Sequence, residues 1–183
     1  MTSSDLHLID GLSATEVALS TVEDGLTGTL YVSSCPGFAK DDEPNEARKQ
    51  AHLDFLTDQG IELVVALTPD DELERLGVGD MPRRIMDAGI NWVQAPVVDR
   101  STPDTDQLAL YIAAMDRVAK VLEADGKALV HCRGGTGRAG KTAAIMLMRY
   151  GMEADDAITL MRSRRNGCVE TPEQEAFVRA YKD

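Results

Sequence analysis

The sequence has few of the residues that build disulfide or zinc frameworks. It contains three cysteines, Cys35, Cys132 and Cys168, and such an odd, sparse set does not form a disulfide framework. CxxC pairs are absent and the three histidines are scattered, so the ligand spacing of a zinc site is missing. Free thiols are typical of a reducing compartment. We therefore expect a cytoplasmic protein that holds no metal and needs no cofactor.

Long apolar runs are missing too. No stretch approaches the roughly 18 consecutive apolar residues that a membrane span needs. Residues 1–5 hold no basic stretch followed by an apolar core, so they predict no secretory signal. We therefore expect no stable membrane association. Repeats and Gly/Ser linkers are also absent, and a length of 183 residues fits a single domain.

Positive charge is scarce overall but locally concentrated. The chain has 19 Lys and Arg residues against 31 Asp and Glu residues, a net charge of −12. Such an anionic surface repels nucleic-acid phosphates, so nucleic acid is not an expected partner. Residues 133–165, however, hold seven basic side chains against three acidic ones. This local excess predicts a binding site for a small anionic group.

Strand-like apolar runs alternate with helical patterns, which predicts an α/β fold whose largely parallel central sheet is flanked by helices. The predicted strands cover residues 28–33, 61–67, 90–98 and 127–132. The predicted helices cover residues 44–59, 69–76, 81–88, 139–150, 154–164 and 172–181. A further long helix is predicted to begin with Thr102 as N-cap, Pro103 at its first position and Asp104 in its first turn.

A glycine-rich loop joins the strand that ends at Cys132 to a helix that is apolar nearly all round. The loop reads Cys-Arg-Gly-Gly-Thr-Gly-Arg over residues 132–138. Its glycines, Gly134, Gly135 and Gly137, remove side chains where backbone N–H groups must converge. Such a nest at a helix N-terminus binds a tetrahedral anion. The loop residues Arg133 to Gly137, with Thr136 among them, are therefore candidates for phosphate binding.

The two ends of the loop supply the reactive groups. Cysteines in electropositive sites of this kind have pKa values of roughly 3.5–7.5, against about 8.5 for a free cysteine. A Cys132 thiolate could therefore attack phosphorus at neutral pH. The planar guanidinium of Arg138 can hold two phosphate oxygens and stabilise the charge that spreads over them in the transition state.

The sequence His131-Cys132-x5-Arg138 resembles the signature loop of the cysteine-dependent protein tyrosine phosphatase superfamily. Residues 35–37, 95–104 and 161–174 resemble corresponding segments of kinase-associated phosphatases, a branch of its dual-specificity group. The resemblance covers roughly residues 28–182. It implies a single-domain dual-specificity phosphatase-like fold, with a catalytic domain over residues 28–183 and an N-terminal segment over residues 1–27 that packs on it. The implied reaction is metal-free hydrolysis of phosphate monoesters through a phosphocysteine.

The reaction also needs an acid that protonates the leaving oxygen, which by resemblance comes from an upstream loop. Asp99 is the best match. It is favoured over Asp104, because Asp104 lies in the first turn of a helix, where the helix dipole already explains the presence of an acidic residue. By resemblance Gln174 helps to place the hydrolytic water, and an exposed helix position is the alternative. His131 is expected to fix the loop by hydrogen bonding.

One position departs from the family pattern. Relatives carry Ser or Thr directly after the loop arginine, and its hydroxyl donates to the sulfur, whereas this chain has Ala139. Either Thr136 or Thr142 could replace the missing donor. Without one, dephosphorylation of the cysteine slows, so a phospho-binding pseudo-phosphatase stays open. Cys35 and Cys168 are expected to be ordinary thiols, and redox pairing with Cys132 is left open.

The resemblance implies phosphotyrosine, phosphoserine or phosphothreonine in a protein, or a small phosphate ester, as substrate. Phosphate, sulfate or vanadate is expected to bind in the loop. Arg133 adds a second cation there, as lysine does in tensin-like lipid phosphatases, so a phosphoinositide or inositol phosphate is an alternative. Residues 135–142 also match the G-x4-G-K-[ST] pattern of NTPases. That interpretation is disfavoured, because no later strand offers the acidic residue that would hold Mg²⁺.

Overall fold

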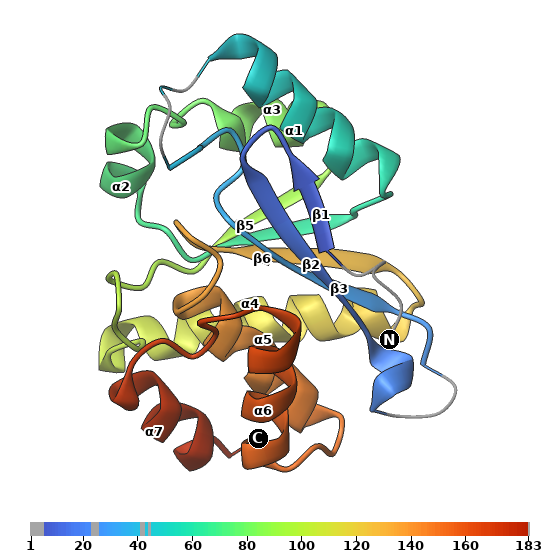
Figure 1. The fold of residues 1–183 in the computed structure, drawn as a ribbon, viewed down its shortest axis with the longest axis vertical. Coiled ribbons are helices and arrows are strands. Elements are labelled where there is room, and N and C mark those ends of the chain that lie inside the picture. The colour runs from blue at the N-terminus through green and yellow to red at the C-terminus, as the bar shows by residue number, and fades with distance from the viewer. Residues whose placement is uncertain (1–5, 23–25, 41–42, 44, 183) are drawn as a thin grey trace.

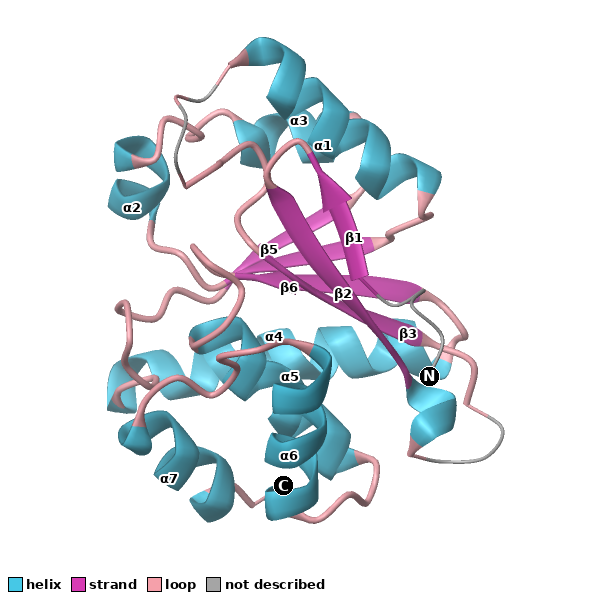
Figure 2. Ribbon diagram, in the orientation of Figure 1, coloured by secondary structure: helices cyan, strands magenta, loops and turns pink. Residues whose placement is uncertain are grey.

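A six-stranded sheet lies at the centre of the computed structural model, which describes residues 6–22, 26–40, 43 and 45–182. The strand order is β1-β2-β3-β6-β4-β5. Helices α1 to α3 cover one face of the sheet and helices α4 to α7 cover the other (Figures 1 and 2). The predicted α/β fold with helices on both faces is confirmed.

Four of the six strands are parallel to one another, as the sequence predicted. They are β3 (Thr29–Ser33), β4 (Leu63–Ala66), β5 (Asn91–Gln94) and β6 (Lys127–His131). Each is shorter than predicted, most clearly β5, which ends at Gln94 instead of continuing to Val98. Because all four run the same way, their carboxyl ends meet at one edge of the sheet, and ligands of such sheets bind at that edge.

The first two strands were not predicted. Strands β1 (Leu6–Ile9) and β2 (Leu12–Ala18) form an antiparallel hairpin, and β2 pairs antiparallel with β3. Residues 6–18 thus extend the central sheet, and a short 3-10 helix, Leu19–Thr21, follows them. Residues 1–5 and 23–25 of the predicted N-terminal segment lie outside the described residues.

The helices match the predicted ranges to within two residues. Their bounds are α1 (Glu46–Asp58), α2 (Asp70–Arg75), α3 (Met81–Asp87), α4 (Thr105–Glu123), α5 (Arg138–Arg149), α6 (Ala154–Arg164) and α7 (Pro172–Ala180). The prediction that Thr102 is the N-cap of α4 is wrong. Asp104 is the N-cap, because its side chain accepts the Gln107 N–H at 2.8 Å while the Gln107 side chain accepts the Asp104 N–H at 3.2 Å.

Two hydrophobic cores lie on opposite faces of the sheet, because side chains alternate along each strand. Val130 of β6 faces the core under α4 to α7, and its neighbour Leu129 faces the core under α1 to α3. Helix α5 lies deep in the first core, with ten of its twelve residues buried. The loop before α5 is therefore anchored at both ends by buried elements. No helix among the described residues has both the length and the apolarity to cross a membrane.

Candidate active site

Cys132 follows the last residue of β6, at the carboxyl edge of the sheet. It is 3% exposed, and the Gly135 N–H donates to its sulfur at 3.2 Å. The sulfur thus lies at the floor of the loop, with a backbone amide directed at it. Such an amide stabilises an anion at this position.

Gly135 shapes the loop. Its φ is +75°, which favours glycine, and a Cβ there would lie 2.4 Å from the carbonyl carbon of Ser33. The loop is therefore pressed against the end of β3. Arg165, at the end of α6, holds the other side by donating to the Gly134 carbonyl at 2.8 Å and to the Ser13 hydroxyl at 2.8 Å. The loop is braced by β2, β3 and α6 together.

Arg138 is the first residue of α5 and is 1% exposed. Its Nη1 donates to Glu72 Oε2 at 2.7 Å and to the Val97 carbonyl at 3.0 Å, and its Nη2 donates to Glu72 Oε1 at 2.8 Å. Burial acts to lower the pKa of Arg138, but the hydrogen bonds to Glu72 and the charges of Cys132, Glu72 and Asp99 outweigh it and raise that pKa. The guanidinium is therefore charged and held in one orientation.

Glu72 is a site residue that the sequence did not predict. It lies in the first turn of α2, is 7% exposed, and forms the two-pronged pair with Arg138. In the sequence it is the third of three consecutive acidic residues at a helix start, a pattern that the helix dipole alone explains. Only its burial distinguishes Glu72 from the neighbouring acidic residues, and no sequence pattern predicts which residue of a six-residue helix is buried.

The structure places Asp99, and not Asp104, next to the loop. Asp99 Oδ1 lies 2.9 Å from Arg138 Nη2, and the Asp99 side chain is 52% exposed. The carboxylate of Asp104 instead caps α4. Asp99 thus lies next to the loop arginine and is also accessible to solvent.

The loop that carries Asp99 is fastened to the start of α7. Arg100 Nη1 lies 3.3 Å from Glu170 Oε1, and Gln174 Nε2 donates to the Ser101 carbonyl at 3.4 Å. Gln174 is fully buried, and its Oε1 accepts the Glu170 N–H at 2.9 Å. The alternative of an exposed helix residue is therefore wrong. Its amide nitrogen lies beside Gly137, because a Cβ on that glycine would be 3.0 Å away.

The missing hydroxyl at Ala139 is not supplied by Thr142. The Thr142 hydroxyl donates to the Arg138 carbonyl at 2.9 Å and is hydrogen-bonded to the Tyr111 hydroxyl at 2.7 Å.

His131 lies at the other side of Cys132, with its ring fully buried and its Nδ1 3.4 Å from the Cys132 carbonyl oxygen. Burial lowers the pKa of His131 to about 4, so its imidazole is neutral at physiological pH.

The other two cysteines are free and buried. Burial raises the pKa of both thiols, for Cys168 to about 12. The Cys35 N–H donates to the Arg133 carbonyl at 3.0 Å, so the chain near Cys35 lies next to the glycine-rich loop. Both thiols are thus un-ionised at neutral pH, unlike the form expected of a nucleophile.

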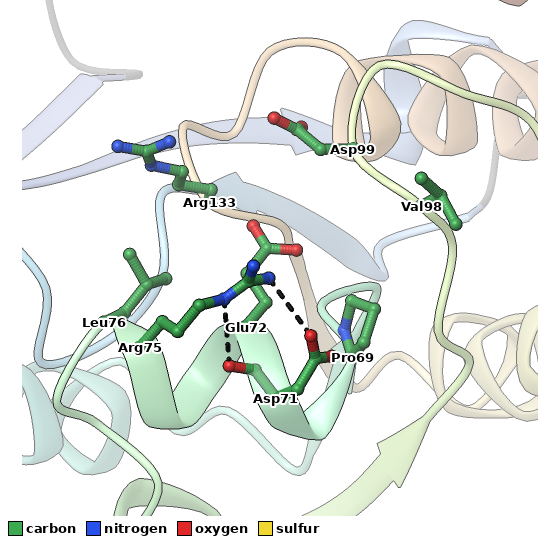
Figure 3. Close-up of a pocket in the computed structure, with 8 residues that line it drawn as sticks. All are labelled: Pro69, Asp71, Glu72, Arg75, Leu76, Val98, Asp99 and Arg133. Carbon is green, nitrogen blue, oxygen red and sulfur yellow. Dashed lines mark hydrogen bonds and ion pairs between the residues drawn. The ribbon is translucent and has the colours of Figure 1, made fainter.

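Two adjoining cavities lie at the mouth of the loop. The first, of about 530 Å³, is lined by residues that Figure 3 labels, with Arg133 and Asp99 on separate loops above the Arg75–Asp71 pair of α2. The second, of about 480 Å³, extends over Lys40, Gly134 and Thr136. Asp99 and Arg133 line both cavities. The predicted binding residues Arg133, Gly134 and Thr136 therefore face space that a substrate could enter.

The NTPase pattern does not form a nucleotide site. The ammonium nitrogen of Lys141, which would clamp a phosphate, lies 5.1 Å from the ring centre of Tyr111 and 4.9 Å from that of Phe177. The residue has no exposed surface. After α5 the described chain forms helices α6 and α7 and no strand.

Similarity to known proteins agrees with this geometry. Residues 44–178 match the family model described as Swiss Army Knife protein, DSP-PTPase phosphatase domain. The cyclin-dependent kinase inhibitor 3 of Rattus norvegicus is 27% identical over 137 residues, which are 73% of this chain and 63% of that protein. The protein tyrosine phosphatase type IVA 3 of Homo sapiens is 32% identical over 51% of this chain and 53% of its own length. The chain thus spans less than two thirds of these relatives.

Solved structures show the same fold. A kinase-associated phosphatase, whose catalytic-site cysteine is replaced by serine, superposes with a TM-score of 0.80 at 23% identity over 97% of this chain and 94% of that one. PTPMT1 in complex with PI(5)P gives a TM-score of 0.67 at 15% identity, over 90% and 92% of the two chains. With the family model covering most of its length, this chain belongs to the dual-specificity group of the cysteine-based protein tyrosine phosphatase superfamily.

Proposed function

We infer that the chain hydrolyses phosphate monoesters, with phosphorylated tyrosine, serine or threonine in proteins as the substrate class. The observation that carries this proposal is the Gly135 N–H that donates to the buried Cys132 sulfur. This backbone N–H can stabilise an anion, and it points at the sulfur of Cys132, the cysteine that begins the glycine-rich loop. The relatives named as protein phosphatases support the substrate class.

In the proposed reaction, the Cys132 thiolate attacks phosphorus and forms the P–S bond while the P–O bond to the leaving group breaks. Asp99 gives its proton to the departing oxygen. A water then attacks the phosphocysteine, Asp99 takes its proton, and phosphate leaves with the thiolate restored. The incoming phosphate competes with Asp99 for Arg138 Nη2, so binding frees the carboxyl group to reach the leaving oxygen.

The test is hydrolysis of an aryl phosphate with EDTA present. The wild type should turn over and be blocked by vanadate, whereas Cys132→Ser should bind phosphate and not turn over. Asp99→Asn should slow release of the leaving group by about 10²–10⁴-fold. If Cys132→Ser kept the wild-type rate, or if EDTA removed all activity, the proposal would be wrong.

An inositol phosphate or phosphoinositide is the second candidate substrate. Lys40, Arg100 and Arg133 line the cavity of about 480 Å³, and PTPMT1 was solved with PI(5)P bound. Asp99 and Glu170 line the same cavity and offset much of that charge. Values of kcat/KM for phosphopeptides and soluble inositol phosphates, compared between wild type and Arg133→Ala, separate the two classes.

Ala139 favours one further possibility, a protein that binds phosphorylated partners and barely turns over. A rapid-mixing experiment decides this. A burst of leaving group equal to the enzyme concentration, followed by slow turnover, indicates a sluggish enzyme. Binding of a phosphopeptide without any burst indicates a binding protein.

A further inference from the structure

Two residues beside the glycine-rich loop adopt a backbone conformation that their side chains disfavour. Arg100 has a φ of +62° and Val169 a φ of +55°. Left-handed backbone is strained for most residues other than glycine, and most of all for a β-branched one such as valine. Such a conformation persists only where the surrounding contacts enforce it, and it is concentrated at functional sites. The contacts that enforce it here join two segments about 70 residues apart in the chain.

The backbone at Val169 brings the next residue, Glu170, to the glycine-rich loop. The Val169 side chain is 2% exposed in the core under α4 to α7, its N–H donates to the Thr136 carbonyl at 3.2 Å, and its carbonyl accepts Arg162 Nη2 at 3.1 Å. As a result, a Cβ on Gly137 would lie only 2.8 Å from Glu170 Oε2. The carboxylate of Glu170 is therefore packed against the last glycine of the loop.

The other oxygen of Glu170 reaches the loop that carries Asp99, because Glu170 Oε1 lies 3.3 Å from Arg100 Nη1. Three hydrogen bonds join the same two segments. The Thr171 hydroxyl donates to the Arg100 carbonyl at 3.4 Å, Gln174 Nε2 to the Ser101 carbonyl at 3.4 Å, and the Thr102 hydroxyl to Glu173 Oε1 at 3.1 Å. Residues 100–102 are therefore held against residues 170–174, and we call these four contacts the clamp.

The clamp holds a turn that presents Asp99 to the site. Asp99 Oδ1 accepts the Arg100 N–H at 3.0 Å, and the Val98 carbonyl accepts the Ser101 N–H at 3.1 Å. The same Asp99 oxygen lies 2.9 Å from Nη2 of the loop arginine. Within one turn, the Asp99 carboxylate thus contacts the loop arginine while the Arg100 side chain contacts Glu170.

We propose that Glu170 is a positioning residue for the acid: packed against Gly137 and paired with Arg100, it holds the Asp99 loop in place beside the glycine-rich loop. This inference rests on the proposed function, in which Asp99 protonates the leaving oxygen. Glu170 acts through Arg100 and transfers no proton itself. Its carboxylate touches both loops, so it fixes the position of one relative to the other.

The first experiment compares kcat/KM for phenyl phosphate, which has a poor leaving group, and 4-nitrophenyl phosphate, which has a good one. The poor leaving group needs the proton from Asp99, whereas the good one departs with little help from an acid. Glu170→Gln removes the charge and keeps the shape of the side chain. The pair is partly exposed, with side-chain exposures of 66% for Arg100 and 36% for Glu170. The rate on phenyl phosphate should therefore fall by about two-fold to five-fold, the worth of such a pair.

The rate on 4-nitrophenyl phosphate should stay within the error of the wild-type value. Equal losses on the two esters would mean that Glu170 has only a structural role, and the proposal would be wrong. Asp155→Asn is the matched control. It breaks an exposed ion pair with Arg179, between α6 and α7, and neither residue lines the cavities at the loop. It should change neither rate.

A double-mutant cycle tests whether Glu170 acts through Arg100. Arg100→Asn removes the cation and introduces a side chain that tolerates left-handed backbone. This variant should lose as much activity on phenyl phosphate as Glu170→Gln does. Adding Glu170→Gln to it should change the rate no further, because the pair is already broken. If the two losses multiplied in full, Glu170 would not act through Arg100 and the proposal would be overturned.

Amide hydrogen exchange measures the clamp without turnover. The N–H groups of Arg100 and Ser101 are hydrogen-bonded within the turn, so their exchange reports how often the turn opens. Glu170→Gln should speed this exchange by about two-fold to five-fold, and Asp155→Asn should not. Unchanged exchange in Glu170→Gln would refute the clamp.

The two measurements separate this inference from the proposed function. If the wild type hydrolysed neither ester, the proposed function would fail, and faster exchange in Glu170→Gln would still support the clamp. If the wild type hydrolysed both esters and Glu170→Gln kept the same ratio of the two rates, the inference would fail and the proposed function would stand.

Discussion

Replacement of Glu72 by glutamine removes one charge from the most buried ion pair of the site and leaves the shape of the side chain intact. Glu72 accepts hydrogen bonds from both terminal nitrogens of Arg138, at 2.7 and 2.8 Å. The side chain of Glu72 is 9% exposed and that of Arg138 is 1% exposed. Glutamine keeps one acceptor oxygen and directs an N–H₂ group at the other guanidinium nitrogen. After the substitution, the buried guanidinium of Arg138 therefore faces another N–H donor, which repels it.

The size of the effect follows from these contacts. Removing one partner of a buried ion pair typically costs about 3–5 kcal/mol, because the other charge stays buried. Arg138 keeps Asp99 Oδ1 at 2.9 Å and the Val97 carbonyl at 3.0 Å, so the lower end applies. We expect a loss of about 3 kcal/mol in the free energy of unfolding. For a chain of this size that lowers Tm by roughly 6–12 °C.

Activity should fall as well, because Arg138 is no longer held in one orientation. Freed from Glu72, its guanidinium pairs more tightly with Asp99, which withdraws both groups from the substrate. We expect kcat/KM on an aryl phosphate to fall by about ten-fold to a hundred-fold, the usual range for a misplaced catalytic group. Urea unfolding without phosphate, together with initial rates, measures the two effects on one preparation.

Glu74→Gln is the matched control, since it removes the same charge from an exposed position of the same helix. It should change the free energy of unfolding by less than about 0.5 kcal/mol. If Glu72→Gln were as stable and as active as Glu74→Gln, the pair with Arg138 would have no role in positioning the loop arginine. The assignment of Glu72 to the site would then be withdrawn.

Three further outcomes are expected. Asp104→Ala should cost about 1 kcal/mol of stability in urea unfolding, as loss of an N-cap does, with kcat unchanged; a loss of activity equal to that of Asp99→Asn would move the acid to Asp104. Ala139→Ser should speed phosphocysteine hydrolysis in rapid-mixing experiments without changing the burst, and an unchanged steady-state rate would show that the missing hydroxyl is not limiting. Lys141→Met should be more stable than wild type, by at most about 5 kcal/mol near pH 6, because each pKa unit is worth about 1.4 kcal/mol and the pKa of Lys141 falls from 10.5 to about 7. The unfolded wild type binds more protons between pH 7 and 10.5, so that difference should shrink as the pH rises through this window, and a constant difference would contradict the shifted pKa.

The glycine-rich loop of residues 132–138 could be predicted from the sequence because its parts are neighbours in the chain. Cys132 and Arg138 are separated by five residues, and the glycines between them leave the backbone few alternatives. The four parallel strands and the helices could be predicted for the same reason, since their apolar patterns and their capping or glycine signals are local. The family resemblance that rested on these residues is confirmed.

The hairpin of β1 and β2 could not be predicted, because the mixed polar and apolar residues of these segments adopt strand structure only when β2 pairs with β3. The partners of Arg138 were hidden for a similar reason. Glu72 is 66 residues away, and in the sequence it resembles any acidic residue at a helix start. The sequence also could not show that the carboxylate of Asp104 caps α4 while that of Asp99 lies beside Arg138, because both contacts depend on the folded chain.

The amino-acid sequence by itself thus determined the glycine-rich loop and the order of the helices and parallel strands, because both depend on contacts between near neighbours in the chain. Tertiary packing decided which distant carboxylates meet Arg138, that Gln174 is buried, and that Lys141 lies between two aromatic rings. Charge in a protein interior depends on what surrounds it in three dimensions, and a linear pattern does not specify those surroundings.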